Sequence, residues 1–295
     1  MTFPLSGVGL WSGELRYGDR GAADAAATEL DELGFPALWI PDVGGNLFEI
    51  VEALLNVTKR TTIATGILNL WMHTGEETSA HHARLTAEHG RRFLVGIGVS
   101  HAPLIDMAEA GKYNKPYSQM VKYLDALDAT PSPLPHDDRI LAALGPKMLK
   151  LSRYRAGGAH PYLVTPAHTA IARESLGRDG ALLLPEQAVV LETDPDKARA
   201  IARQHLSIYA TLPNYVNNWL RLGFTEDDVS NGVSDRLVDA LVVWGDEAAI
   251  KARVQEHFDA GADHVCLQLL AAPESMAATN GMPLEGWRRL AAAML

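Results

Sequence analysis

Two titratable residues follow short apolar runs, at the points where buried parallel strands would end. Asp42 follows ALWI with one proline between, and His101 follows GIGVS. An imidazole with an ordinary pKa near 6.5 suits acid–base catalysis at neutral pH, and a carboxylate can relay a proton or orient a ligand. We therefore predict that Asp42 and His101 are catalytic. The alternatives are that Asp42 caps the turn at Gly44 and Gly45, and that His101 is structural.

The sequence LGPK at residues 144–147 could bind an anion. Glycine permits a close backbone approach, proline presets the first helical turn, and the free N–H groups of that turn attract negative charge. Together with the ammonium group of Lys147, this junction predicts a phosphate site formed by Gly145, Pro146 and Lys147. An ordinary helix start is the alternative.

Other candidate positions are a glycine within an apolar strand and aromatic residues at strand ends. Gly66 interrupts the run ATGILNLW, which indicates a bulge or a close approach of the backbone to a ligand. We expect Trp11, Trp71 and Tyr162, each at a predicted strand end, to line a substrate pocket. The sequence has no H-E-x-x-H pattern, and we expect no metal site.

Short apolar runs alternate with longer amphipathic segments throughout the chain. The predicted strands cover residues 7–11, 37–41, 62–70, 93–99, 139–144, 160–164, 187–192 and 264–270. Helices are predicted over 19–33, 46–57, 79–89, 117–127, 146–154, 167–176 and from Pro195 onward.

Eight strands, each followed by a helix, predict a (β/α)₈ TIM barrel, with an open doubly wound sheet as the alternative. The segment 213–245 predicts a helical insertion before the last βα unit, within one domain spanning residues 1–295. Active sites in such barrels lie at the carboxyl ends of the strands, which is where the candidate residues stand.

Composition narrows the classes of function. The net charge is −10 and the pI about 5.5, which disfavours nucleic-acid binding because that requires a basic surface. The single cysteine, Cys266, excludes an intrachain disulfide and a cysteine-cluster metal site. We see no apolar run long enough to cross a membrane and no signal peptide. We therefore expect a cytoplasmic protein that acts on a small molecule.

The chain resembles the luciferase-like class of coenzyme F420-dependent oxidoreductases over nearly its whole length. The resemblance is carried by FPALWIPD, ATGILNLW, FLVGIGVSHAP, LGPKMLKLS, GAHPYLVTPAHT and the closing WGDEAAIKARVQEHFDAGADHVCLQLL. The last segment is the most specific, because members of the class end on a similar helix and a Gly-Ala-Asp turn before strand eight.

The resemblance implies a deazaflavin cofactor and a cis peptide bond between Gly66 and Ile67. It places Asp42 near the redox edge of the cofactor ring. It places His101 where some members carry a glutamate proposed as a proton donor. The cofactor-binding residues that it implies are Gly66, Ile67, Asn69, Gly98, Val99, Ser100, Gly145, Pro146 and Lys147.

The resemblance has two departures, both on the substrate side of the pocket. Many members carry Asp-His after strand two, where this chain has Asp42-Val43. Strand six commonly ends in an Asp-Gly-Trp type of sequence, where this chain has His160-Pro161-Tyr162. The resemblance therefore implies hydride transfer and, by analogy, a homodimer, but no particular substrate. An FMN-dependent monooxygenase and a non-catalytic cofactor-binding member are the alternatives.

Overall fold

The computed structural model describes residues 2–177, 180–230, 232–271 and 280–295. Its centre is a parallel sheet whose strands pair mainly in chain order. Along the sheet come β1 (Gly7–Trp11), β2 (Ala37–Ile40), β3 (Thr62–Thr65), β5 (Phe93–Gly98), β6 (Arg139–Leu141), β7 (Gly158–Ala159) and β8 (Leu182–Leu183). On its other side, β1 pairs with β11 (His264–Leu269), which pairs with β9 (Glu186–Val190).

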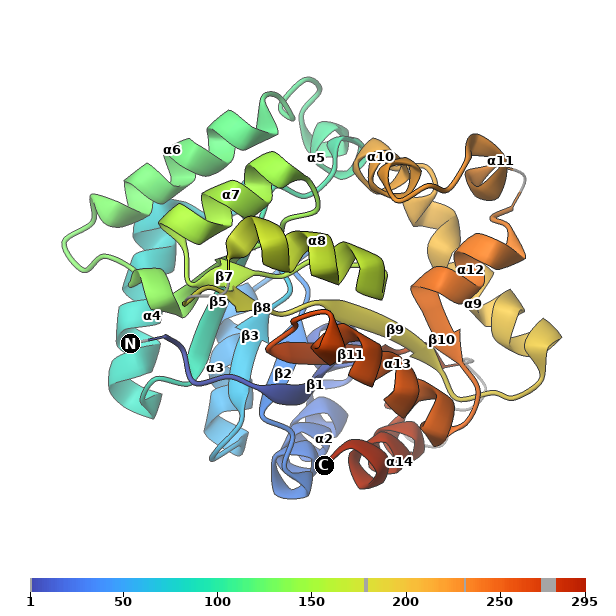
Figure 1. Ribbon diagram of the computed structural model, residues 1–295. Helices are drawn as coiled ribbons and strands as arrows, with labels where there is room; N and C mark the ends of the chain where they lie inside the picture. Colours follow the sequence, from blue (N-terminus) through green and yellow to red (C-terminus); the bar gives the residue numbers. More distant parts are fainter. Residues whose placement is uncertain (1, 178–179, 231, 272–279) are drawn as a thin grey trace.

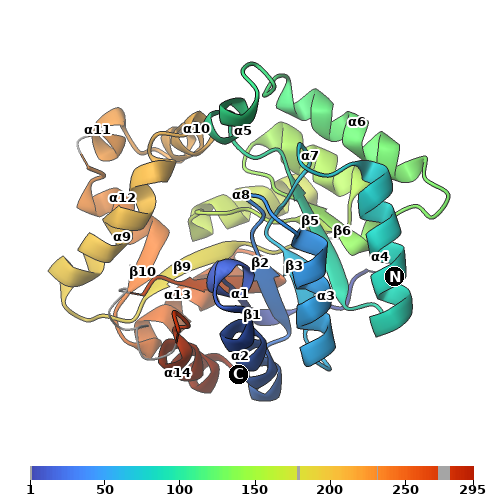
Figure 2. The same cartoon turned by 180° about the vertical axis from the view of Figure 1, so that it is seen from behind.

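The sheet closes on itself because β8 and β9 are successive parts of one extended segment. On one edge of this segment Leu184 N donates to Ala159 O, which continues the pairing with β7. On the other edge Cys266 N donates to Pro185 O, which begins the pairing with β11. Helices surround the sheet in both views (Figures 1 and 2). The predicted TIM-barrel-like α/β fold is thus confirmed, and the doubly wound alternative is excluded.

The helices begin and end largely where the sequence predicts. Asp19 caps α2 through Ala22 N, and Gly34 ends that helix at a φ of 102° that suits glycine. The first helices are α1 (Glu14–Tyr17), α2 (Arg20–Leu33), α3 (Leu47–Val57), α4 (Gly75–His89), α5 (Ala102–Ala108), α6 (Pro116–Asp128), the 3₁₀ helix η1 (His136–Asp138), α7 (Pro146–Arg155) and α8 (Pro166–Leu176). They are followed by α9 (Pro195–Tyr209), α10 (Pro213–Arg221), α11 (Glu226–Val229), α12 (Asp235–Leu241), α13 (Glu247–Asp259) and α14 (Leu284–Met294).

Several boundaries differ from the prediction. The fourth helix starts at Gly75 rather than Ser79, because Thr74 and Glu77 form a reciprocal capping box. The sixth predicted strand, at residues 160–164, corresponds to β7, which already ends at Ala159. Pro161 has no N–H group to pair and Leu163 adopts a φ of 51°, so the strand does not continue through the predicted range. Elements that were not predicted include helix α5 and the short strand β10 (Val242–Trp244) inside the insertion.

The third predicted strand is divided into β3 and β4 (Leu68–Asn69) by a bulge at Gly66. Ala64 faces Leu94, whereas Leu68 faces Ile97, so four residues on this strand match three on its neighbour. The peptide bond between Gly66 and Ile67 is cis, as the resemblance implied. This bulge lies at the carboxyl end of the barrel, beside the indole of Trp11.

The interior of the barrel is filled by a compact apolar cluster. Its members include Trp39, Ala64, Leu94, Ile140 and Cys266, which come from five different strands and are almost fully buried. A larger cluster joins the outer side of the sheet to the helices. The barrel is therefore packed below its carboxyl end.

No helix in the described ranges is long and apolar enough to span a membrane.

Candidate active site

A cavity of about 810 Å³ opens at the carboxyl ends of the strands. The barrel contributes Trp11, the Gly66–Ile67 bulge and the segment from Gly98 to His101. The predicted residues that line this cavity are Trp11, Asp42, Gly66, Ile67, Gly98, Val99, Ser100, His101, Gly145, Pro146, Lys147 and Tyr162. The structure thus brings together residues separated by more than a hundred positions in the chain.

Two predicted site residues, Asn69 and Trp71, are not among the lining residues. Asn69 is fully buried, and its Oδ1 accepts a hydrogen bond from Trp71 N at 3.1 Å. The indole of Trp71 donates to the carbonyl of Val99 at 2.7 Å instead of facing a ligand. Neither residue belongs to the cavity lining, and their predicted contacts with cofactor and substrate stay predictions.

The carboxylate of Asp42 is also turned away from the cavity surface, although the residue borders it. Its side chain is fully buried and accepts hydrogen bonds from Gly44 N at 3.3 Å and Asn69 N at 3.0 Å. His73 Nε2 lies 3.1 Å from the same carboxylate. These contacts favour the capping interpretation of Asp42 over direct catalysis, because no oxygen is left facing a ligand.

His73 was not singled out by the sequence analysis, yet it places an imidazole against Asp42. It stands after β4, whereas the resemblance led us to look for an imidazole next to Asp42 in the sequence. Burial opposes protonation of His73, but the hydrogen bonds and charges of Asp42 and Glu77 together outweigh this effect and raise the pKa of His73. The pair therefore supports the loops after β2 and β4.

His101 lies at the cavity surface, at the start of α5. Ser100 before it has a φ of 54°, which turns the chain sharply after β5. The imidazole packs 5.4 Å from the ring of Tyr215 and forms a hydrogen bond with the Asn214 side chain. Burial lowers the pKa of His101, and the bond to Asn214 offsets this effect only in part. Its Nδ1 has no hydrogen-bond partner among the described residues. A neutral imidazole at this position can accept a proton.

A cationic cradle stands at another part of the cavity, where α7 begins. No side chain caps this ten-residue helix, whose N-cap is Gly145 and whose first residue is Pro146. Lys147 is exposed, and Arg221 reaches the same place from α10. A Cβ on Gly145 would lie 3.8 Å from the Arg221 guanidinium, which shows how near this group is to the start of the helix. The cradle suits a phosphate.

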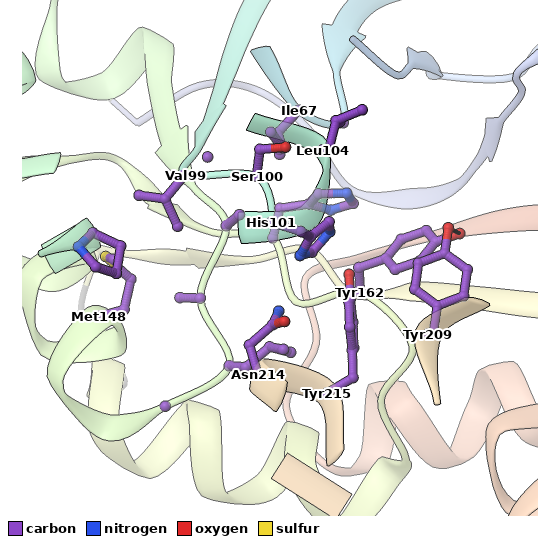
Figure 3. Close-up of a pocket in the computed structure, with 18 of the residues that line it drawn as sticks. Ile67, Val99, Ser100, His101, Leu104, Met148, Tyr162, Tyr209, Asn214 and Tyr215 are labelled. Carbon is purple, nitrogen blue, oxygen red and sulfur yellow. Dashed lines mark hydrogen bonds between the residues drawn. The ribbon is translucent and has the colours of Figure 1, made fainter. Parts of the chain in front are cut away.

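Aromatic side chains form the wall opposite Met148, as Figure 3 shows for Tyr162, Tyr209 and Tyr215. The ring of Tyr162 lies 5.6 Å from Trp11 and 5.5 Å from Tyr209, and Tyr209 lies 5.1 Å from Tyr215. We refer to Trp11, Tyr162, Tyr209 and Tyr215 as the aromatic wall. The Tyr162 hydroxyl donates to Gln268 Oε1 at 2.7 Å and lies 3.1 Å from the Tyr209 hydroxyl.

His160 lies beneath this wall at the floor of the cavity. Its ring stacks on Trp39 at 4.5 Å, and Nδ1 donates to the carbonyl of Leu184 at 2.7 Å. Burial lowers its pKa to about 4, so the ring is neutral and Nε2 keeps a lone pair. A Cβ on Gly66 would come within 2.6 Å of Trp11 Nε1 and 3.2 Å of His160 Nε2, which explains the glycine there.

A model of the family described as luciferase-like monooxygenase matches residues 10–264 of this chain. The chain belongs to this family. No curated protein matches it significantly. Among solved structures, this luciferase-like protein resembles an F420-dependent secondary alcohol dehydrogenase in complex with an F420-acetone adduct, with 15% identity, a TM-score of 0.72, and coverage of 98% of this chain and 99% of the other.

Two further structures show that the fold is shared by proteins with different cofactors. The F420-dependent tetrahydromethanopterin reductase from Methanopyrus kandleri is 16% identical, with a TM-score of 0.70 and coverage of 98% of this chain and 99% of the other. The oxygenating constituent of 3,6-diketocamphane monooxygenase from Pseudomonas putida, in complex with FMN, is 12% identical, with a TM-score of 0.66 and 99% coverage of both chains. At these identities the similarity establishes the fold of the luciferase-like protein.

Several of the lining residues that the sequence analysis missed come from the insertion and the helix before it. Arg221, Asn214 and Tyr215 belong to α10, and Tyr209 ends α9. A weak signal was present, because Asn214 and Arg221 are seven positions apart and so share one face of a helix. No cluster of metal-ligating side chains occurs among the residues that the structure describes.

Proposed function

We propose that the luciferase-like protein is an F420-dependent oxidoreductase that transfers a hydride between the deazaflavin and an organic substrate. The observation that carries the proposal is that the cationic cradle and the neutral imidazole of His101 line one cavity. A phosphorylated redox cofactor needs the cationic cradle. A substrate that gains or loses a hydride also exchanges a proton, and the imidazole can take part in that exchange.

The residues present fit such a cofactor. The cavity of about 810 Å³ falls within the range of roughly 300–1,000 Å³ typical of ligand sites. Gly145, Lys147 and Arg221 would hold the phosphate, since the unblocked helix start and two cations converge there. The Gly66–Ile67 bulge and Gly98 would lie along the ring, because both border the apolar middle of the cavity.

A bound deazaflavin would supply two-electron hydride chemistry. The protein would hold it, exclude water with the apolar lining, and move the accompanying proton. His101 suits the role of base, because burial favours its neutral form and Nδ1 has no partner in the described chain. Asp42, through Asn69 and Gly44, would keep the adjoining loops in place rather than touch the substrate.

An FMN-dependent monooxygenase is the second candidate, because the same cradle would suit the phosphate of FMN. The FMN complex of the similar diketocamphane monooxygenase supports it. The two F420-dependent structures described above have higher TM-scores, 0.72 and 0.70 against 0.66, which supports the deazaflavin.

The decisive experiment titrates the purified protein with F420 and with FMN and measures binding by fluorescence and by calorimetry. We expect F420 to bind more tightly than FMN. Lys147→Glu should weaken F420 binding at least tenfold, about 1.4 kcal/mol, because it reverses a charge in the cradle. Lys150→Glu is the matched control, since Lys150 lies exposed on the same helix outside the cavity. Binding of FMN alone would favour the monooxygenase, and binding of neither cofactor would refute both proposals.

A further inference from the structure

The charged groups of the cavity are confined to one part of it. Among the described lining residues, and leaving histidines aside, only Asp42, Lys147 and Arg221 are of acidic or basic type. The carboxylate of Asp42 is fully buried and occupied by Gly44, Asn69 and His73. The two cations stand in the cradle at the start of α7. The aromatic wall and its neighbours thus present no charged side chain to a ligand.

The groups behind the aromatic wall are neutral as well. Glu186 is fully buried, and its Oε2 accepts a hydrogen bond from Leu163 N at 2.9 Å. Burial raises the pKa of Glu186 to about 8, so the carboxyl group is mostly protonated at neutral pH. Burial lowers the pKa of His205, which lies 3.3 Å from the Tyr162 hydroxyl, to about 4. A charged ligand on this wall would lose its hydration without gaining a counter-ion.

The polar atoms left over on the wall suit one neutral oxygen. The hydroxyls of Tyr162 and Tyr209 already bond each other, and Tyr162 also donates to Gln268. The Tyr215 hydroxyl has no hydrogen-bond partner within the described ranges. The centre of its ring lies 5.4 Å from the centre of the His101 imidazole. Figure 3 shows Tyr215, His101 and Asn214 around the same space. A hydroxyl or carbonyl oxygen would find hydrogen-bonding groups there, next to aromatic faces.

We propose that the aromatic wall is the substrate subsite and that it takes an uncharged aromatic alcohol or ketone. This inference rests on the function proposed above. The rings of Trp11, Tyr162, Tyr209 and Tyr215 would pack against the apolar body of the substrate. Tyr215 and His101 would bind its oxygen. Carboxylates and phosphates are excluded from the wall because the cations that could pair with them lie in the cradle.

The test compares acetophenone with two charged derivatives, 4-acetylbenzoate and 4-acetyl-N,N,N-trimethylanilinium, and includes 4-tert-butylacetophenone, which is neutral and has the shape of the trimethylanilinium, as the control for size. Their dissociation constants are measured by calorimetry on the purified protein, alone and with F420 added. We expect acetophenone to bind at least tenfold more tightly than either charged probe. Tyr215→Phe keeps the ring and should weaken acetophenone binding roughly three- to tenfold, the usual effect of one hydrogen bond. Tyr154→Phe, 61% exposed on α7, is the control and should change nothing.

Each contrary outcome overturns the inference. Equal or tighter binding of 4-acetylbenzoate would reveal a counter-ion on the wall, and tighter binding of the trimethylanilinium would make the wall a cation site. Absence of acetophenone binding up to its solubility limit would show that the wall is no aromatic subsite. An unchanged affinity in Tyr215→Phe would remove Tyr215 from it. Failure of the proposed function would be seen separately. In that case F420 would not bind, whereas the protein would still bind acetophenone more tightly than the charged probes.

Discussion

Replacing Glu186 by glutamine should change how stability depends on pH. The unfolded chain ionises this group near 4.5, whereas burial raises its pKa to about 8 in the folded state. Between these values the folded protein holds one proton more than the unfolded chain. The contribution of Glu186 to the free energy of unfolding is therefore fully present below pH 4.5 and is lost as pH rises towards 8.

The size of the effect follows from the shift. A difference of about 3.5 pKa units corresponds to at most about 5 kcal/mol, of which about 2 kcal/mol falls between pH 5 and pH 7. Glutamine keeps an oxygen for Leu163 N but cannot ionise. The stability of Glu186→Gln relative to the parent should therefore rise by about 2 kcal/mol from pH 5 to pH 7.

Urea unfolding followed by tryptophan fluorescence at several pH values measures this difference. Any constant cost of the substitution cancels, because only the change with pH is compared. Glu174→Gln, at an exposed position of α8, is the control and should run parallel to the parent at every pH. Parallel curves for Glu186→Gln as well would show that Glu186 is ionised in the folded protein, and the account of an uncharged aromatic wall would lose that support.

Three further predictions concern the site and its surroundings. His101→Ala should bind cofactor nearly normally but lose about 10²–10⁴ in turnover, and parent kcat/KM should fall as pH drops through the lowered His101 pKa; turnover at the parent rate would end its role as base. Asp42→Ala should reduce the free energy of unfolding by about 1–3 kcal/mol, because buried N–H groups lose their acceptor, and should weaken cofactor binding through the displaced loops; unchanged melting would contradict this. In the Glu186→Gln variant, which lacks the opposing pH dependence of Glu186, acid should destabilise the protein as pH falls from about 6.5 to 4, because the folded state keeps His160 and His264 neutral, with pKa values of about 4. A flat stability curve of that variant, measured with urea over that window, would refute it.

The sequence predicted those elements whose causes are local. Asp19 and Gly34 mark the ends of α2 because a cap and a left-handed turn depend only on neighbouring residues. The sixth strand was displaced in the prediction, because the predicted range 160–164 contains Pro161, which has no N–H group to pair. That proline was the available signal.

The candidate site was predictable only where barrel strands end in it. Gly98 and His101 follow from strand position, whereas Arg221 and Tyr215 depend on how an inserted helix packs over the barrel, which no local pattern determines. His73 reaches Asp42 from a separate loop, so adjacency in the sequence was the wrong criterion for that imidazole.

Helix α10 has a consequence for how this enzyme class could diversify. Tyr215 and Arg221 stand on one nine-residue helix, so this helix sets the separation between the aromatic wall and the cationic cradle at about 9 Å along its axis. One residue inserted between them would rotate Arg221 by about 100° away from the cavity and leave Tyr215 in place. A change in the length of this helix would therefore alter the proposed cofactor site without altering the proposed substrate subsite, while the barrel beneath stays the same.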